Sequence, residues 1–123
     1  MCLQKKMCLK RKPVFIYKVV RRVDGVFTAL YRRIYKESWD ENPAKYTLNK
    51  WAKKLDPHEG IAAFTNLKTA KLFQYKYKKI YREEAVYVLK CKYKNFECFG
   101  IGTDYSLPNN IYVGSIYPIK VIK

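Results

Sequence analysis

Acidic residues are scarce in this chain, and their scarcity sets it apart from an ordinary globular domain. Its 123 residues include 10 Asp and Glu against 26 Lys and Arg, a formal net charge of +16 at pH 7. A charge of this size repels itself and destabilises the compact state unless something anionic offsets it. AT-rich codons favour Lys and Tyr, so genome composition offers a second explanation for the lysines. It explains the pairs Arg21-Arg22 and Arg32-Arg33 less well.

Long apolar runs are also missing. No stretch approaches the roughly 20 apolar residues of a membrane-spanning helix, and the first 13 residues lack the apolar core of a secretory signal peptide. We therefore expect a soluble cytoplasmic protein that has no membrane partner.

Residues that carry metal or catalytic chemistry are few and poorly spaced. Five residues separate Cys2 from Cys8 and six separate Cys91 from Cys98, whereas zinc sites use two to four. The single histidine, His58, lies in a turn-like segment, and Gly100-Ile101-Gly102 is not followed by a helical pattern. We expect no metal, no cofactor and no enzymatic activity. A small transferase-type enzyme built around His58 and Glu59 is the alternative.

The first half of the chain predicts an arm and a hairpin. Residues 1–13 form a basic N-terminal arm, and residues 14–123 form a single α+β domain. Two β-branched and aromatic runs, 14–23 and 26–35, flank Asp24-Gly25, a dipeptide that suits a type I′ turn. This predicts a β-hairpin that pairs Val23 with Val26 and Arg21 with Thr28. Trp51, in the irregular segment that follows, is expected in the core.

The second half predicts a helix and further strands. Ile61–Phe64 reads as a short strand, Asn66 as an N-cap, and Leu67–Tyr77 as an amphipathic helix. Residues 85–94 alternate as a half-buried strand, with Lys90, Lys92 and Lys94 on one face. A turn at Lys94-Asn95 would return the chain and place Cys98 opposite Cys91. Such a pair lies within disulfide reach, but in a reducing cytosol both are expected to be small core residues.

These elements predict an α+β fold: a small, mostly antiparallel, twisted β-sheet of about five or six strands with one main helix packed on one face. The predicted core residues are Val19, Leu30, Phe64, Leu67, Ala70, Phe73, Tyr87, Leu89 and Cys91.

Basic and aromatic residues interleave at the end of the predicted helix, from Gln74 to Arg82, and again from Lys90 to Lys94. Single-stranded nucleic acid sites combine cations for phosphates with rings for unstacked bases. Solvated lysines beside core tyrosines would give the same pattern. The predicted partner-binding residues are Lys10, Arg11 and Lys12 in the arm, Arg21, Arg22, Arg32 and Arg33 on the hairpin, and Tyr75, Lys76, Lys78, Lys79, Tyr81 and Arg82 at the helix end.

The layout of the chain resembles a diffuse set of short phage and prophage proteins of uncharacterised function. The resemblance rests on Tyr17–Val20, Asp24-Gly25, Lys50-Trp51, Gly60–Phe64, Asn66, Ala70, Phe73, Val88–Cys91 and Ile119–Val121. It implies an origin in a mobile element and action in the host cytoplasm. Small phage accessory proteins often bind host machinery, including nucleic-acid-guided defence systems.

Two hypotheses follow for a non-enzymatic protein. In the first, the chain contacts nucleic acid or a ribonucleoprotein complex through phosphates, and log K falls by about 0.9 per duplex phosphate neutralised as log salt rises. In the second, it inhibits a host defence nuclease, in the manner of an anti-CRISPR protein, by docking directly on that protein.

Overall fold

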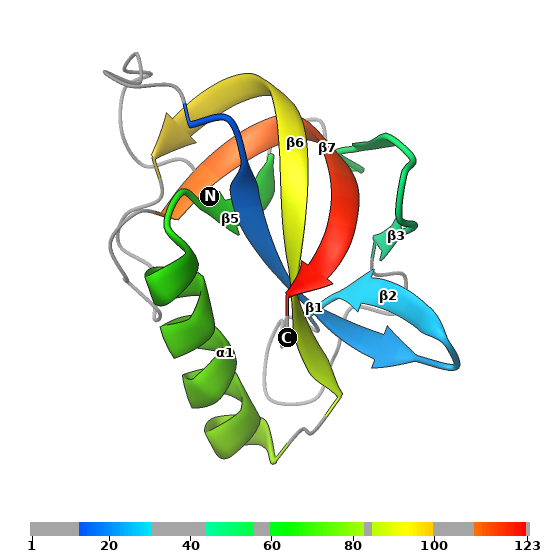
Figure 1. The fold of residues 1–123 in the computed structure, drawn as a ribbon, viewed down its shortest axis with the longest axis vertical. Coiled ribbons are helices and arrows are strands. Elements are labelled where there is room, and N and C mark those ends of the chain that lie inside the picture. The colour runs from blue at the N-terminus through cyan, green and yellow to red at the C-terminus, as the bar shows by residue number, and fades with distance from the viewer. Residues whose placement is uncertain (1–12, 31–43, 56–59, 83–84, 100–109, 123) are drawn as a thin grey trace.

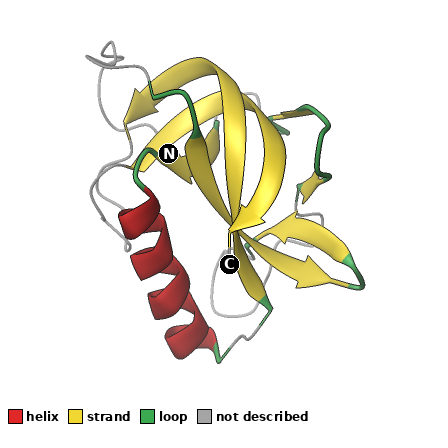
Figure 2. Cartoon of the chain, in the orientation of Figure 1, coloured by secondary structure: helices red, strands yellow, loops and turns green. Residues whose placement is uncertain are grey.

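The fold was analysed in a computed structural model that describes residues 13–30, 44–55, 60–82, 85–99 and 110–122. The predicted arm, Arg32, Arg33, His58 and Glu59 lie outside these ranges. The elements in chain order are β1 (Ile16–Val23), β2 (Val26–Ala29), β3 (Lys45–Tyr46), β4 (Ala52–Lys53), β5 (Ile61–Phe64), α1 (Leu67–Tyr81), β6 (Val86–Phe99) and β7 (Asn110–Ile122). The described residues thus form an α+β fold with seven strands and one helix. Figure 2 shows the helix lying beside the curved sheet.

The sheet closes on itself as a small barrel. β1 pairs with β6, β6 with β7, β7 with β5, and β5 returns to β1, each time antiparallel. Closure is tightest between the long strands β6 and β7 and weakest at the seam between β1 and β5, where the pairing is Tyr17 with Phe64. The fold is α+β as predicted, but it is more dominated by sheet than the predicted twisted sheet of about five or six strands (Figure 1).

The Asp24-Gly25 hairpin is confirmed. Asp24 has φ 51° and Gly25 has φ 78°, the pair of positive angles that a type I′ turn requires. Val23 pairs with Val26 and Arg21 with Thr28, in the predicted register.

The second predicted hairpin is wrong. Lys94 and Asn95 lie within β6, which continues to Phe99 and pairs with β7 on both sides of them, Lys94 with Ser115 and Phe96 with Val113. Asn95 does take a positive φ of 61°, but β7 offers a longer partner than a local return of the chain, so the strand bends there and continues. Cys91 pairs in register with Pro118, far along the strand from Cys98.

Asn66 caps the helix as predicted. Its side-chain oxygen accepts hydrogen bonds from the amides of Lys68, at 2.8 Å, and Thr69, at 3.3 Å. The helix runs one turn further than its predicted end at Tyr77 and stops at Tyr81, with Arg82 in the left-handed conformation as its C-cap.

Among the described residues, no helix is long and apolar enough to cross a bilayer.

Replacing Asn66 with Ala is expected to lower the free energy of unfolding by about 1 kcal/mol, because two amides lose their acceptor. Urea unfolding followed by circular dichroism measures this. Asn66→Ser keeps a capping oxygen and should stay within a few tenths of a kcal/mol of the unchanged chain. Equal losses in both variants would contradict a capping role.

Two apolar clusters stabilise the barrel from inside and outside. The inner cluster draws on all four strands of the closed ring: Ile16, Val20, Tyr46, Ile61, Ala63, Leu89, Cys91, Ile111, Val113 and Ile116. The outer cluster lies beneath α1: Val19, Phe64, Ala70, Tyr77, Val86 and Val88. Both faces of β1 are therefore covered.

Most of the predicted core residues belong to these clusters. Five of them are buried, Val19, Phe64, Ala70, Leu89 and Cys91, whereas Leu30, Leu67, Phe73 and Tyr87 are half-buried and pack against the clusters. Trp51 is a clear error, because 43% of its surface is exposed. It directly precedes the two-residue strand β4 and lies on the outside of the barrel.

Candidate nucleic-acid interface

The outward face of β6 changes character along the strand. Val86 and Val88 are buried in the outer cluster beneath α1. Two residues further on, the helix no longer covers this face, and Lys90, Lys92 and Lys94 follow at alternate positions. Because side chains at alternate positions of a strand point the same way, the three lysines form a line along the outside of the barrel.

Each of these lysines lies over an aromatic ring. The ammonium nitrogen of Lys90 is 4.2 Å from the ring centroid of Phe15, that of Lys92 is 5.6 Å from Tyr117, and that of Lys94 is 4.2 Å from Trp51. The rings come from the segment before β1, from β7 and from the segment before β4. We call these three lysines with their three rings the lysine–ring ladder.

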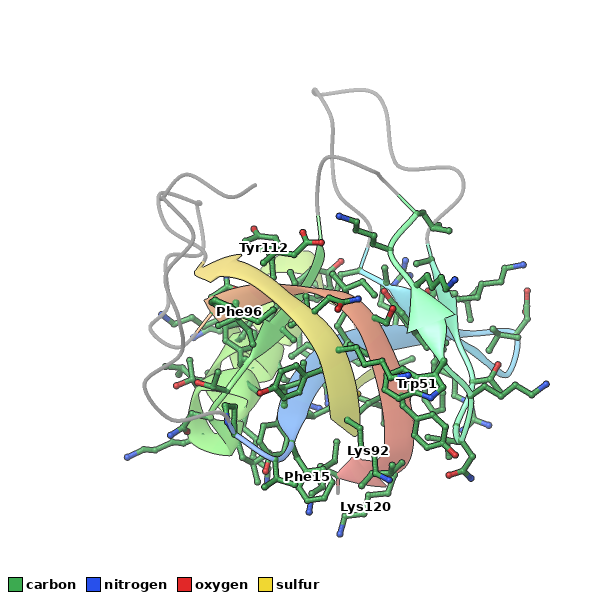
Figure 3. The ribbon with its side chains drawn as sticks, turned by 90° about the horizontal axis from the view of Figure 1, so that it is seen from above. Phe15, Trp51, Lys92, Phe96, Tyr112 and Lys120 are labelled. Carbon is green, nitrogen blue, oxygen red and sulfur yellow. The ribbon has the colours of Figure 1, made fainter. Side chains whose placement is uncertain are left out.

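Further cations and ring contacts extend the ladder sideways. Trp51 and Tyr117 pack against each other with centroids 5.3 Å apart and planes tilted by 54°. Lys120 of β7 pairs in register with Lys90, and Lys53 of β4 pairs with Ser115. Figure 3 shows Phe15, Lys92, Lys120 and Trp51 gathered over the same part of β6 and β7, apart from Phe96 and Tyr112.

Little negative charge offsets this surface within the described residues. The acids found there are Asp24, in the hairpin turn, and Glu97. Glu97 accepts a hydrogen bond of 2.5 Å from the ammonium of Lys54, so its charge is already paired. The ladder is a positively charged surface that carries exposed aromatic area.

Two of the four predicted hairpin arginines, Arg21 and Arg22, lie on β1. Arg21 is half-buried, while Arg22 is exposed with its guanidinium 5.6 Å from the ring centroid of Phe27. The backbone amide of Arg22 also donates to the carbonyl of Ala85. Arg22 is thus a further cation above an aromatic ring, and it lies outside the ladder.

The predicted helix-end residues from Tyr75 to Tyr81 belong to α1 itself, and Arg82 is its C-cap. Lys76, Lys79 and Arg82 are exposed, Lys78 is half-buried, and 62% of Tyr75 is exposed. The position of the Tyr81 side chain, like Lys10, Arg11, Lys12, Arg32 and Arg33, lies outside what the structure describes. The predicted residues that can be placed therefore lie on the hairpin and on α1, and none belongs to the ladder.

Lys18 lies on the inward face of β1. It shares its side of β1 with Ile16 and Val20, which are fully buried inside the barrel. Its ammonium donates to the carbonyl of Ala62 at 2.7 Å and lies 6.0 Å from the ring centroid of Tyr46. Ala62 belongs to β5, so this hydrogen bond bridges the sparsely paired β1–β5 seam.

Burial changes the protonation of this internal group. Desolvation lowers the pKa of Lys18 to about 8, against an opposing effect of nearby Cys91. Desolvation also raises the pKa of the Cys91 thiol to about 12, and it raises the pKa of the Tyr46 hydroxyl above its ordinary value. The thiol donates to the carbonyl of Leu89 at 3.5 Å, which makes Cys91 an inert core residue rather than a nucleophile.

Within the part of the chain that the structure describes, no group of three or more His, Cys, Asp or Glu side chains could hold a metal ion. His58 and Glu59, the residues of the alternative enzyme hypothesis, are not among the described residues.

The sequence predicted the three lysines of the ladder on one strand face, but not the three rings. The alternation of Lys90, Lys92 and Lys94 placed them on one strand face, as the structure does. Phe15, Trp51 and Tyr117 come from three distant segments, and only the closure of the barrel brings them to the same face.

A scan against family models, a search of curated proteins and a search of solved structures each found no match to this chain.

Proposed function

We propose that this protein is a non-enzymatic nucleic-acid-binding protein and that the lysine–ring ladder is its binding surface. The observation that carries the proposal is the repeated coupling of a cation with a ring, at Lys90 with Phe15, Lys92 with Tyr117 and Lys94 with Trp51. Lysines neutralise phosphates, and rings accept unstacked bases. A face that served solubility alone would have no reason to hold rings beneath its cations.

Burial and charge favour this surface over the hairpin and helix arginines and lysines. Trp51 supplies large exposed aromatic area beside three lysines, whereas the exposed cations of α1 surround Tyr75 as the one strongly exposed ring described there. The helix and hairpin cations would contribute a general attraction that brings an anion to the molecule.

Binding is expected to be strongly salt-dependent. The binding constant for a fluorescently labelled oligonucleotide, measured by anisotropy at several salt concentrations, should fall linearly with salt on logarithmic axes, because neutralised phosphates release counterions. Affinity that stays flat from low to moderate salt would contradict phosphate binding.

An inhibitor that docks on a nuclease would also carry a basic surface, so the partner itself must be tested. Affinity purification from the native host, with and without nuclease treatment, separates the two readings. We expect nucleic acid to be recovered and to be lost after the treatment. Recovery of one host protein at equal yield after nuclease treatment would overturn the proposal in favour of direct protein binding.

A further inference from the structure

We infer that the lysine–ring ladder binds single-stranded nucleic acid along β6, as three consecutive nucleotides, each using one lysine and one ring. This inference rests on the proposed function and deepens it, because it names the form of nucleic acid, the number of nucleotides and the direction of the track.

The distance between neighbouring lysines of the ladder matches the distance between neighbouring phosphates of a single strand. Alternate residues of a β-strand lie about 6.5 Å apart, which is close to the distance between successive phosphates in an extended single strand. Lys90, Lys92 and Lys94 occupy three such alternate positions on one face. One lysine can therefore meet one phosphate at each step, without the chain of nucleotides having to coil or stretch.

The rings of the ladder offer faces on which bases can stack. Each of the three lysines has a ring of its own, at 4.2, 5.6 and 4.2 Å from its ammonium. When a phosphate draws an ammonium away from its ring, because a charge-assisted contact is stronger than a contact with a ring face, that ring face becomes available to a base. Trp51 is the main platform, since 43% of its surface is already exposed, while Phe15 and Tyr117 are half-buried.

The form of the nucleic acid follows from these rings. In a duplex the bases are paired and stacked inside, so their faces cannot reach a ring on a protein surface without being flipped out. Duplex phosphates also follow a helical path, whereas the lysines follow one strand. The ends of the track are fixed by Val88, which is buried beneath α1, and by Asn95, where the positive φ bends β6.

A length series of oligothymidylates, from one to eight nucleotides, tests the inference by isothermal titration calorimetry in about 50 mM salt. After correction for the number of binding registers, affinity should rise steeply up to three nucleotides and little beyond. The salt slope for the trinucleotide that carries a 5′-phosphate, and therefore three phosphates, should be about −2, from about −0.7 for each of them. A hairpin duplex of the same charge should bind at least tenfold more weakly than an eight-nucleotide single strand.

Two variants locate the site. Trp51→Ala should weaken binding of the single strand by about 10- to 100-fold, the range observed for loss of one stacking ring. Tyr75→Ala removes a more exposed ring from α1 and should change affinity less than about twofold. Equal losses in the two variants would overturn the assignment of the ladder.

The outcomes separate the inference from the proposed function. Absence of binding at every length and in both forms, at low salt, would end both. Salt-dependent binding with no change of slope at three nucleotides, or with the duplex bound as well as the single strand, would end the inference alone and leave a phosphate-binding protein.

Discussion

Exchange of Lys90, Lys92 and Lys94 together for Gln is expected to reduce the affinity for single-stranded oligonucleotide by roughly 100- to 1000-fold at about 50 mM salt. Each single-strand phosphate contact contributes about 0.7 to the logarithmic salt slope, so three lost contacts remove most of the electrostatic free energy of binding at low salt. All three lysines point outward from β6 and none bonds across the barrel seam, so the fold should persist. Fluorescence anisotropy measures the affinity, and circular dichroism checks the melting temperature.

The matched control removes the same charge from α1. Lys71, Lys76 and Lys79 are exposed on the helix, which lies on one side of the barrel while β4 lies on the other (Figure 1). Their joint exchange for Gln lowers the net charge by the same amount and should reduce affinity no more than about fivefold, through weaker long-range attraction. If the two triple variants lose affinity equally, net charge rather than the ladder determines binding.

Replacement of Lys18 with Met is expected to change stability in opposite directions at neutral and alkaline pH. Below about pH 8, the pKa of Lys18 in the folded state, the buried amine is protonated in both states, and the folded chain bears the full cost of burying its charge. From pH 8 to 10.5 the unfolded chain keeps its proton while the folded chain releases it, so stability rises with pH and the cost is relieved. The difference between pKa values of about 8 and 10.5 corresponds to about 3 kcal/mol as an upper limit, since Lys18 keeps some solvent exposure.

Lys18→Met removes both the buried charge and the hydrogen bond to Ala62. Because Ala62 is half-buried, its carbonyl without this donor costs an amount at the low end of about 1–3 kcal/mol. The variant should therefore gain stability at pH 7, where the charge cost dominates, and lose stability at pH 10.5, where the lost hydrogen bond dominates. Urea unfolding of both proteins at pH 7, 8, 9 and 10.5 measures the difference.

Two neighbouring groups titrate in the opposite sense. Cys91, with its pKa raised to about 12, holds its proton in the folded state above pH 9, and Tyr46, with its pKa also raised, does so above pH 10. Both lower stability as pH rises, so the difference between the two proteins is the informative quantity rather than either curve alone. A difference between Lys18→Met and the unchanged chain that does not vary with pH would contradict the buried amine.

Structural features that neighbouring residues determine could be predicted from the sequence. Features that depend on residues far apart in the sequence could not. The Asp24-Gly25 hairpin and the Asn66 cap were predictable because a few neighbouring residues determine them. The predicted Lys94-Asn95 turn is wrong although Asn95 has a positive φ. Pairing with the distant β7 outweighed the local return, and sequence periodicity does not reveal such competition.

The same distinction between local and distant residues applies to the candidate site. Alternation along one strand placed the three lysines, whereas the ring partners required the barrel to close. Trp51 was assigned to the core because large aromatic residues usually lie there, yet it stands on the surface against Tyr117 and Lys94. Lys18 faces inward because the sheet curls around it, and local sequence patterns do not indicate such a closure.

The fluorescence of Trp51 tests the central claim most directly. The other tryptophan, Trp39, is replaced by Phe so that Trp51 alone reports, and the protein is titrated with a single-stranded trinucleotide while binding is followed in parallel by calorimetry. Stacking of a base on Trp51 predicts saturable quenching with the same dissociation constant as the calorimetric curve, reversed by added salt. Binding seen by calorimetry with no change in Trp51 fluorescence would contradict the lysine–ring ladder as the nucleic-acid site.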